Sequence, residues 1–310
     1  MQLAAFKDQG QVRIGALSGR WMIDLKRARQ HLARGSHFEE LPTSLIGLFR
    51  AGDDLMAELD EIVRQIVLLP AEDEPNLITN EILRPADGIQ YLPPVQAPGK
   101  ILCVGLNYPV PGALAERSAY PVIFGKFSNT LVGHRQMILL PSASQQVACE
   151  GELVLVIGRA GKHIPLERAL EHLAGVTLAN DLTAIDLESR SSQWMTGKLP
   201  DTFTPLGPVL VTLDEIPALE ELVLRTYRNG ELALSGYTGA MFFGARALIS
   251  YLSGITTLEA GDLILTGSPK GIDNQPAPRV IVHPGDEIVV EIESIGRLVN
   301  HAIVEENDGQ

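Results

Sequence analysis

Two apolar runs near the middle of the chain predict a pair of buried strands. The first, residues 153–157, is preceded by Glu150 and Glu152, and the second, residues 176–179, leads to Asp181. Because side chains alternate between the two faces of a strand, the two glutamates are expected to point to the same side. The pattern therefore places acids at the N-terminal end of the first buried strand and at the C-terminal end of the second.

The spacer between the two runs has the periodicity of an amphipathic helix. Its leucine and alanine positions recur at steps of three and four residues. Pro165 suits the first turn of such a helix, and Gly175 suits its C-terminal end. A strand, a helix and a second strand would bring the three flanking carboxylates together.

Burial of these acids would require a partner. Carboxylates on a buried strand are costly unless a cation neutralises them. An all-oxygen ligand set that leaves room for water and substrate suits Mg²⁺, Mn²⁺ or Ca²⁺ better than Zn²⁺. The alternative is a solvated face, since a Glu-x-Glu pair on an edge strand is commonly exposed. The apolar runs on both sides favour burial, and with it a metal site.

Residues 1–95 predict a small, separate α+β domain. Short apolar runs broken by polar turns indicate an antiparallel meander, and helical patterns follow. Residues 91–99 are rich in proline and glycine and form the predicted linker. No catalytic pattern is visible, so packing or dimerisation is the expected role. The predicted strands are residues 3–6, 12–17 and 21–25, and the helical patterns lie in residues 45–49 and 55–66.

Residues 96–310 predict a β-rich second domain with few helices. Asn229 and Gly230 mark a hairpin turn, and residues 189–208 form a polar loop expected to lie over a site. The predicted strands are residues 101–104, 121–126, 137–140, 222–228, 263–265, 286–293 and 298–304, and one helix is predicted over residues 240–252.

The composition of the chain limits which partners and cellular locations are expected. The chain has 310 residues, 45% of them hydrophobic, which suits two domains with proper cores. The net charge of −13 argues against nucleic acid or an anionic membrane as the main partner. Neither a membrane span nor a signal peptide is recognisable. Cys103 and Cys149 lie in or beside apolar runs and are expected as buried thiols, so the predicted location is cytoplasmic.

Several short motifs follow one another in a characteristic order across residues 98–305. They are KILCVGLNY, FGKF followed by LVG, EGELVLVIG, LANDLTAID, QW, GK with DTF and PLGP, RNG, and LEAGDLILTGSPKGI. This order resembles the fumarylacetoacetate hydrolase family, and the preceding module resembles that of two-domain bacterial members. The resemblance implies a mixed β-roll or β-sandwich domain, a homodimer, and one Mg²⁺ or Mn²⁺. Family members cleave, decarboxylate, hydrate or isomerise small 2-oxo and 1,3-dicarbonyl acids.

The resemblance also implies roles for individual residues. It implies metal ligands at Glu150, Glu152 and Asp181, in agreement with the apolar pattern. Lys198 corresponds to the active-site lysine, whose ammonium group can stabilise a developing oxyanion; without the resemblance it would be taken for a solvated loop lysine.

Four further residues are expected to bind substrate. Gln193 and Thr266 match positions that line the family's pocket, although ordinary backbone capping is the alternative for both. Tyr108 belongs to the Asn-Tyr motif. Lys270 is unusual in its turn, where it offers a positive charge for a substrate carboxylate, and a surface lysine is the alternative.

One catalytic position departs from the family pattern. Hydrolytic members carry a histidine three residues after the Asn-Tyr motif, where it acts with a glutamate to activate water. Here that position is Pro111, which cannot accept a proton. Glu116 is the candidate for the paired acid, and His134 is a second candidate base only if the fold turns it inward.

Three functions remain open at this point. The first is metal-dependent C–C bond hydrolysis of a 1,3-dicarbonyl or 2-oxo acid. The second is an isomerase, decarboxylase or hydratase reaction on a related acid, which depends less on a base that activates water. The third is a non-catalytic ligand-binding or structural relative. The retention of three acids and Lys198 around one point argues against the third.

Overall fold

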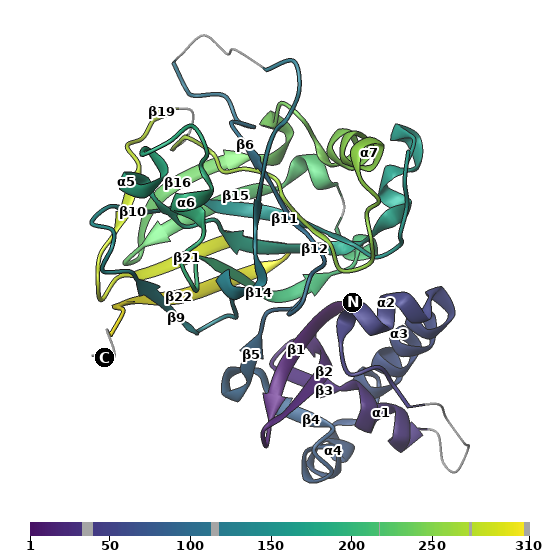
Figure 1. Cartoon of the computed structure of the whole chain (residues 1–310). Coiled ribbons are helices and arrows are strands. Elements are labelled where there is room, and N and C mark those ends of the chain that lie inside the picture. The colour runs from purple at the N-terminus through teal and green to yellow at the C-terminus, as the bar shows by residue number, and fades with distance from the viewer. Residues whose placement is uncertain (33–39, 113–117, 217, 273–274, 307–310) are drawn as a thin grey trace.

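The computed structural model describes residues 1–32, 40–112, 118–216, 218–272 and 275–306. Figure 1 shows a small N-terminal part in purple and blue beside a larger strand-rich part. The predicted meander is present as β1, β2 and β3, with β4 at its edge. Ser44 begins α2, since its hydroxyl accepts the Gly47 N–H at 3.1 Å. These elements are β1 (Gln2–Asp8), β2 (Gln11–Ser18), β3 (Trp21–Asp24), β4 (Leu83–Pro85), α1 (Leu25–Leu32), α2 (Leu45–Ala51), α3 (Asp53–Val67) and α4 (Glu74–Thr79).

The largest sheet joins both parts of the chain. Among the described residues its main path runs β4–β3–β2–β1–β14–β12–β11–β17–β6–β7. At the junction β1 pairs antiparallel with β14, so that Gln2 and Leu3 lie opposite Val211 and Leu210. Sheet hydrogen bonding therefore continues between the N-terminal part and the larger part. The strands involved are β5 (Gln90–Leu92), which also pairs with β1, β6 (Ile101–Gly105), β7 (Val122–Lys126), β11 (Gly151–Ile157), β12 (Leu173–Asn180), β14 (Thr204–Val211) and β17 (Leu263–Leu265).

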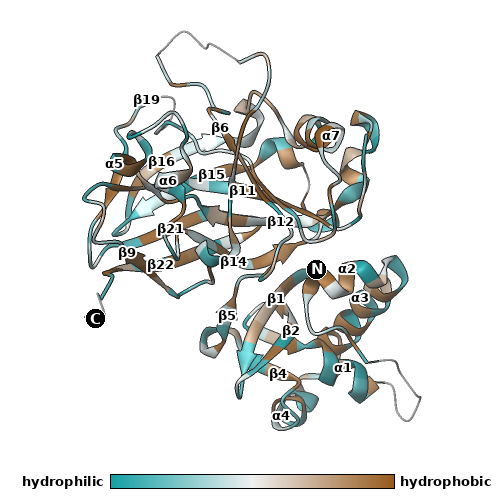
Figure 2. Ribbon diagram, in the orientation of Figure 1, coloured by the Kyte–Doolittle hydropathy of each residue, from teal (hydrophilic) through white to brown (hydrophobic). Residues whose placement is uncertain are grey.

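A second sheet, in the order β16–β15–β21–β22–β9, packs against the first. The predicted hairpin through Asn229 and Gly230 is present as β15–β16, and β21 and β22 form a second hairpin near the C-terminal end. Leu155 and Leu178 of the first sheet share a core with Val290 of the second, and Figure 2 shows hydrophobic residues along strands of both sheets. The elements are β9 (Met137–Leu140), β10 (Val147–Cys149), β15 (Val223–Arg228), β16 (Glu231–Tyr237), β21 (Glu287–Ile292) and β22 (Gly296–Val304).

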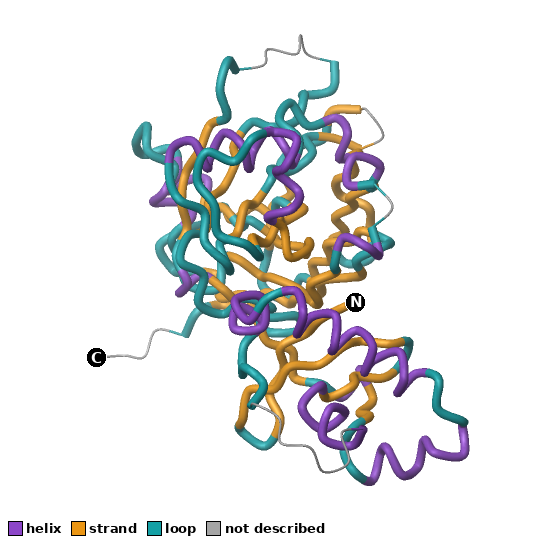
Figure 3. Tube along the Cα trace, turned by 90° about the vertical axis from the view of Figure 1, so that its right-hand side faces the viewer, coloured by secondary structure: helices purple, strands orange, loops and turns teal. Residues whose placement is uncertain are grey.

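Smaller elements cover the ends of the two sheets. Figure 3, turned by 90°, places the N-terminal helices and strands together below the strand-rich part. No helix within the described ranges is long and apolar enough to cross a membrane. The remaining strands and α-helices are β8 (Leu131–Val132), β13 (Thr183–Ala184), β18 (Gly271–Ile272), β19 (Gln275–Pro276), β20 (Val280–Val282), α5 (Ile185–Glu188), α6 (Met195–Lys198) and α7 (Ala245–Ile255).

Three predicted boundaries were wrong. The spacer helix is a short 3₁₀ helix over Leu166–His172, and Gly175 lies inside β12 and does not end a helix. A Cβ at Gly175 would overlap the Val211 carbonyl group, so the close approach of β14 explains this glycine. The helix predicted over residues 240–252 begins at Ala245. Part of the predicted loop of residues 189–208 is α6 and the start of β14.

His134 is turned into the protein, against Tyr91. The two rings meet edge to face with centroids 5.2 Å apart, and His134 Nδ1 accepts the Val299 N–H at 3.1 Å. Burial, followed by the charge of Arg135, lowers the pKa of His134 from 6.5 to about 4. At a pH between about 4 and 6.5, His134 binds more protons in the unfolded chain than in the folded chain. His134 therefore contributes stability above its unfolded pKa that is lost as the pH falls toward 4.

We expect this loss to be measurable in urea denaturation. Between about pH 7.5 and about pH 5.5, the free energy of unfolding should fall on the order of 1 kcal/mol more in the wild type than in His134→Asn. Asparagine can still accept the Val299 N–H, so the comparison isolates the titration. His163→Asn, which makes the same replacement at an exposed position, serves as the control. An equal pH dependence in the wild type and His134→Asn would contradict the prediction.

Candidate active site

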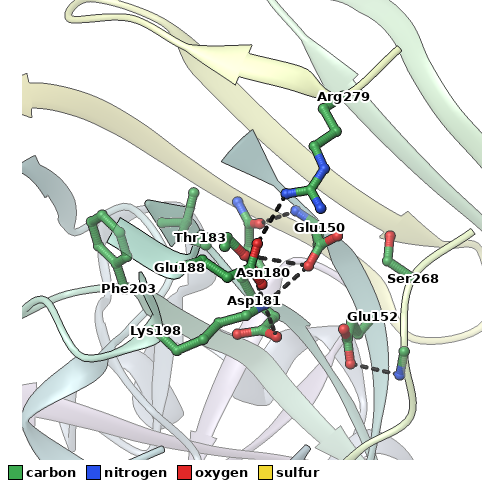
Figure 4. Close-up of polar contacts among 12 residues, drawn as sticks. Glu150, Glu152, Asn180, Asp181, Thr183, Glu188, Lys198, Phe203, Ser268 and Arg279 are labelled. Carbon is green, nitrogen blue, oxygen red and sulfur yellow. Dashed lines mark hydrogen bonds and ion pairs between the residues drawn. The ribbon is translucent and has the colours of Figure 1, made fainter. Parts of the chain in front are cut away.

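The three acids that flank the apolar runs converge in the structure. Glu150 lies between β10 and β11, Glu152 is in β11, and Asp181 directly follows β12. One carboxylate oxygen of each lies within 4.8 Å of the others, and Figure 4 shows the side chains around one point. The Asp181 N–H donates to the Glu150 carbonyl at 2.8 Å, and the Glu150 N–H donates to the Asn180 side chain at 2.9 Å. The pairing of β11 with β12 thus fixes the spacing of the acids.

Glu152 is the most enclosed of the glutamates at this site. It is 3% exposed, and its carboxylate accepts the Gly267 N–H at 2.7 Å. Gly267 has a φ of +95°, and a Cβ there would lie 2.9 Å from the Val104 carbonyl oxygen, so glycine is required to present this N–H. Burial, followed by the charge of Asp181, raises the pKa of Glu152 well above its usual value. A bound cation would favour the ionised carboxylate.

Lys198, the expected active-site lysine, lies between two of the acids. Its ammonium nitrogen is 2.6 Å from Asp181 Oδ2 and 3.0 Å from Glu150 Oε2. The side chain is 3% exposed, and the nitrogen lies 5.1 Å from the centroid of the Phe124 ring. Burial acts to lower the pKa of Lys198, but Asp181 and Glu150 outweigh it and raise the pKa. In this arrangement the two acids hold Lys198 as a positive charge.

Sequence reasoning misses a second buried lysine, Lys126. Its ammonium group donates to Asp181 Oδ1 at 2.6 Å and to the carbonyl oxygens of Phe203 at 2.7 Å and Leu182 at 3.4 Å. Burial lowers the pKa of Lys126, and the charge of Asp181 acts in the opposite direction. Asp181 thus accepts a hydrogen bond from Lys126 at one carboxylate oxygen and from Lys198 at the other. The sequence signal was a lysine closing an otherwise apolar strand.

Glu150 is held by two lysines. Lys270 Nζ lies 2.6 Å from Oε1, and Lys198 Nζ lies 3.0 Å from Oε2. Burial acts to raise the pKa of Glu150, but the charges of the two lysines outweigh it and hold the pKa below its usual range. Arg279 lies nearby, 3.2 Å from Glu188 (Figure 4).

These groups line a cavity of about 120 Å³. Its acidic part is flanked by Phe124 and Trp194, which meet edge to face with ring centroids 5.7 Å apart. A Cβ at Gly105 would overlap the Trp194 indole, so the strand backbone lies directly under that ring. The volume suits a small acid. A larger cavity of about 750 Å³ lies between the helical N-terminal part and the ends of β11 and β12, and it does not contain the acidic triad.

The residues expected to bind substrate take different positions. Lys270 lines the cavity. Thr266 is fully buried, and its hydroxyl donates to a backbone carbonyl at 2.9 Å. Tyr108 is buried, its hydroxyl has no hydrogen-bond partner in the part of the chain that the structure describes, and burial followed by the charge of Glu152 raises its pKa. Gln193 is exposed and lies outside the described cavity lining.

The cavity lining contains no histidine among the described residues. Glu116 lies outside the described residues. Pro111 packs beside Gly271, where an added Cβ would lie 2.8 Å from Pro111 Cγ. His134 is held by Tyr91 and Val299 and is not among the residues that line this cavity. The fold therefore does not bring His134 to the acids.

The donor set fits a hard divalent cation. Three carboxylates approach one another within 4.8 Å, two of the three are buried, and no sulfur or imidazole ligand accompanies them among the described residues. Hard cations such as Mg²⁺ and Mn²⁺ prefer oxygen ligands of this type.

Comparisons with known proteins agree with this geometry. Residues 100–303 match the family model described as fumarylacetoacetate (FAA) hydrolase C-terminal. The chain is similar to oxaloacetate tautomerase FAHD2A, mitochondrial, of Homo sapiens, with 40% identity over 230 residues and 71% of each chain covered. It is also similar to oxaloacetate tautomerase YisK of Bacillus subtilis (strain 168), with 35% identity over 285 residues, covering 90% of this chain and 92% of that protein.

The fold is shared with solved structures as well. The structure of fumarylacetoacetate hydrolase from psychrophilic Exiguobacterium antarcticum matches with a TM-score of 0.78 and 31% identity, over 98% of this chain and 100% of that chain. This likeness confirms the predicted β-rich α+β fold.

Proposed function

This chain belongs to the fumarylacetoacetate hydrolase family, and from that premise we propose that it is a metal-dependent tautomerase of a small 2-oxo dicarboxylic acid, with oxaloacetate as the first candidate. The observation that carries the proposal is the composition of the site. The acidic triad and Lys198 lie together, while Pro111 stands where the family resemblance implies a histidine base. Two relatives that bear the name oxaloacetate tautomerase support the same reaction.

The loss of the histidine affects hydrolysis and tautomerisation unequally. Hydrolysis of a C–C bond consumes water, which must lose a proton to a positioned base as it attacks. Tautomerisation only moves one proton: a C3–H bond breaks, an O–H bond forms at the C2 oxygen, and no water is consumed. Tautomerisation still needs an acceptor for the C3 proton, but it does not need the histidine that positions and activates water, so a site that has lost this histidine and keeps its positive charges favours tautomerisation.

The chain's own residues have distinct tasks in this reaction. Glu150, Glu152 and Asp181 would hold Mg²⁺ or Mn²⁺, which as a Lewis acid polarises a carbonyl group. The Lys198 ammonium group, fixed 2.6 Å from Asp181, places positive charge where the C2 oxygen becomes negative. Lys198 serves in this proposal as the positive charge, and Glu116 is our candidate for the proton acceptor.

The charge of the site suits a dianion. The three carboxylates are matched in number by the ammonium groups of three lysines, which contact Asp181 and Glu150. A divalent cation would leave this cluster with two excess positive charges, which a dicarboxylate substrate would neutralise. Buried charges of one sign are unfavourable without such compensation.

A second candidate function is C–C bond hydrolysis. It is favoured by the likeness, along nearly the whole chain, to the Exiguobacterium antarcticum structure named fumarylacetoacetate hydrolase. If this reaction operates, a group other than Pro111 must activate the water. A non-catalytic role is the third candidate, and the retention of the three acids and Lys198 around one point counts against it.

An ultraviolet assay distinguishes these functions. The purified protein is tested with Mn²⁺ or Mg²⁺, after chelation and after metal is restored, against oxaloacetate and an acylpyruvate, with metal alone as the blank. We expect faster interconversion of the keto and enol forms of oxaloacetate, lost on chelation and regained with metal. Cleavage of the acylpyruvate into two acids without any effect on oxaloacetate would favour hydrolysis. Inactivity toward both, with metal bound, would contradict the proposal.

We further propose a cytoplasmic homodimer. Cys103 and Cys149 are free, buried thiols, which suits a reducing compartment. Size-exclusion chromatography with light scattering tests the dimer, and a monomer at micromolar concentration would contradict it.

A further inference from the structure

Glu150 has both carboxylate oxygens engaged, yet it is one of the three candidate metal ligands. Lys270 is at Oε1 and Lys198 at Oε2, at 2.6 Å and 3.0 Å. A cation that binds Glu150 must either share a carboxylate oxygen with one of these lysines or displace that lysine. The two lysines differ in how firmly they are held.

Lys198 is held by two acids, whereas Lys270 is held by one. Lys198 is 3% exposed and is also bonded to Asp181 at 2.6 Å. Lys270 is 32% exposed, and within the described chain Glu150 is the partner of its ammonium group. The Lys270–Glu150 pair is only partly buried, so water or a substrate can replace Glu150 as the partner of Lys270, which is not possible for the buried Lys198. A cation at the triad would therefore displace Lys270 and leave Lys198 in position.

The displaced ammonium group would remain at the cavity. Lys270 and Arg279 both line it, and Arg279 is already paired with Glu188 at 3.2 Å. Phe124 and Trp194 supply apolar surface on the same cavity. When a cation binds Glu150, the Lys270 ammonium group loses its acceptor. Of these groups, Lys270 is then the one that can donate hydrogen bonds to a ligand in the cavity.

We propose that Lys270 is a specificity-determining residue that a divalent cation releases from Glu150 and that then binds the second carboxylate of a dicarboxylate substrate. This inference rests on the proposed function and goes further by assigning the distal carboxylate to one residue. It makes selection for a dianion depend on prior metal binding, since Lys270 is engaged by Glu150 until a cation arrives. A monoanionic 2-oxo acid would gain nothing from Lys270.

The first test measures metal binding without any organic ligand. Calorimetric titration with Mn²⁺ compares the wild type with Lys270→Met and with Lys162→Met, which removes an exposed lysine outside the cavity. We expect Lys270→Met to bind Mn²⁺ about two- to fivefold more tightly, because a competitor for Glu150 is gone. Lys162→Met should bind like the wild type. Weaker binding by Lys270→Met would overturn the displacement.

The second test measures selectivity on the Mn²⁺-loaded proteins. The probes are oxaloacetate and 2-oxobutyrate, which have the same carbon number and differ in a terminal carboxylate or methyl group. We expect Lys270→Met to lose roughly tenfold or more in affinity for oxaloacetate and less than about twofold for 2-oxobutyrate, with Lys270→Arg retaining most of the preference. Equal losses for both probes, or none, would overturn the inference. If the wild type binds neither probe, the proposed function fails instead. The metal titration still shows whether a cation displaces Lys270 from Glu150.

Discussion

Replacing Glu152 by glutamine will abolish turnover and weaken Mn²⁺ binding by more than about 100-fold, while the protein stays folded. Loss of an outer-shell partner alone weakens metal sites roughly 10- to 100-fold, and here a charged ligand itself is lost. Glutamine keeps the length of the side chain and an oxygen that can accept the Gly267 N–H, now at 2.7 Å. Because burial raises the pKa of Glu152, a neutral amide suits the site. The free energy of unfolding without metal should stay unchanged or rise.

Two measurements separate the effects on the site and on the fold. Calorimetric titration with Mn²⁺ gives the affinity, and urea denaturation in the presence of a chelator gives the stability. The control is Glu171→Gln, which removes an exposed carboxylate paired with Arg168 on the surface. An unchanged Mn²⁺ affinity in Glu152→Gln would show that the triad is not the metal site.

Replacing Lys126 by methionine will lower the free energy of unfolding by roughly 3–5 kcal/mol, the usual effect of removing one partner of a buried ion pair. The substitution leaves Asp181 Oδ1 and the Phe203 carbonyl without the donor that now lies 2.6 Å and 2.7 Å away. Turnover should fall too, because Asp181 loses the contact that orients it toward the other acids. Added Mn²⁺ should restore part of the stability, since a ligand that binds only the folded state stabilises it.

Urea denaturation with and without Mn²⁺ tests this expectation. Lys7→Met removes an exposed lysine and should change the stability by less than about 0.5 kcal/mol. Lys126→Gln keeps a donor at the buried position, so it should lie between the wild type and Lys126→Met. If Lys126→Met were as stable as Lys7→Met, the buried contacts of Lys126 would have no energetic role.

The convergence of the acids could be predicted because it depends on local rules. The period of a strand places Glu150 and Glu152 on one side, and an antiparallel return brings Asp181 beside them. The intervening helix could not be predicted correctly. A periodic pattern does not reveal that Leu173 and Gly175 are already paired with β11, or that β14 approaches Gly175.

The lysines around the acids illustrate the limit of sequence reasoning. Lys126 is distant in sequence from Asp181 and reaches it only because β7 and the end of β12 meet in the folded chain. Lys270 was recognised as unusual in its turn, but its contact with Glu150 depends on the path of the chain after β17. Such pairs are set by tertiary packing, which no spacing within one segment encodes.

The pairing of β1 with β14 ties the N-terminal part to the catalytic sheet. β14 is hydrogen-bonded to β1 on one side and on the other side to β12, the strand that ends beside Asp181. A chain shortened to residues 96–310 would leave part of β14 as an open edge, and open edges promote association between molecules. A swap of N-terminal parts between relatives would therefore succeed only when the incoming β1 edge matched β14 of its new partner.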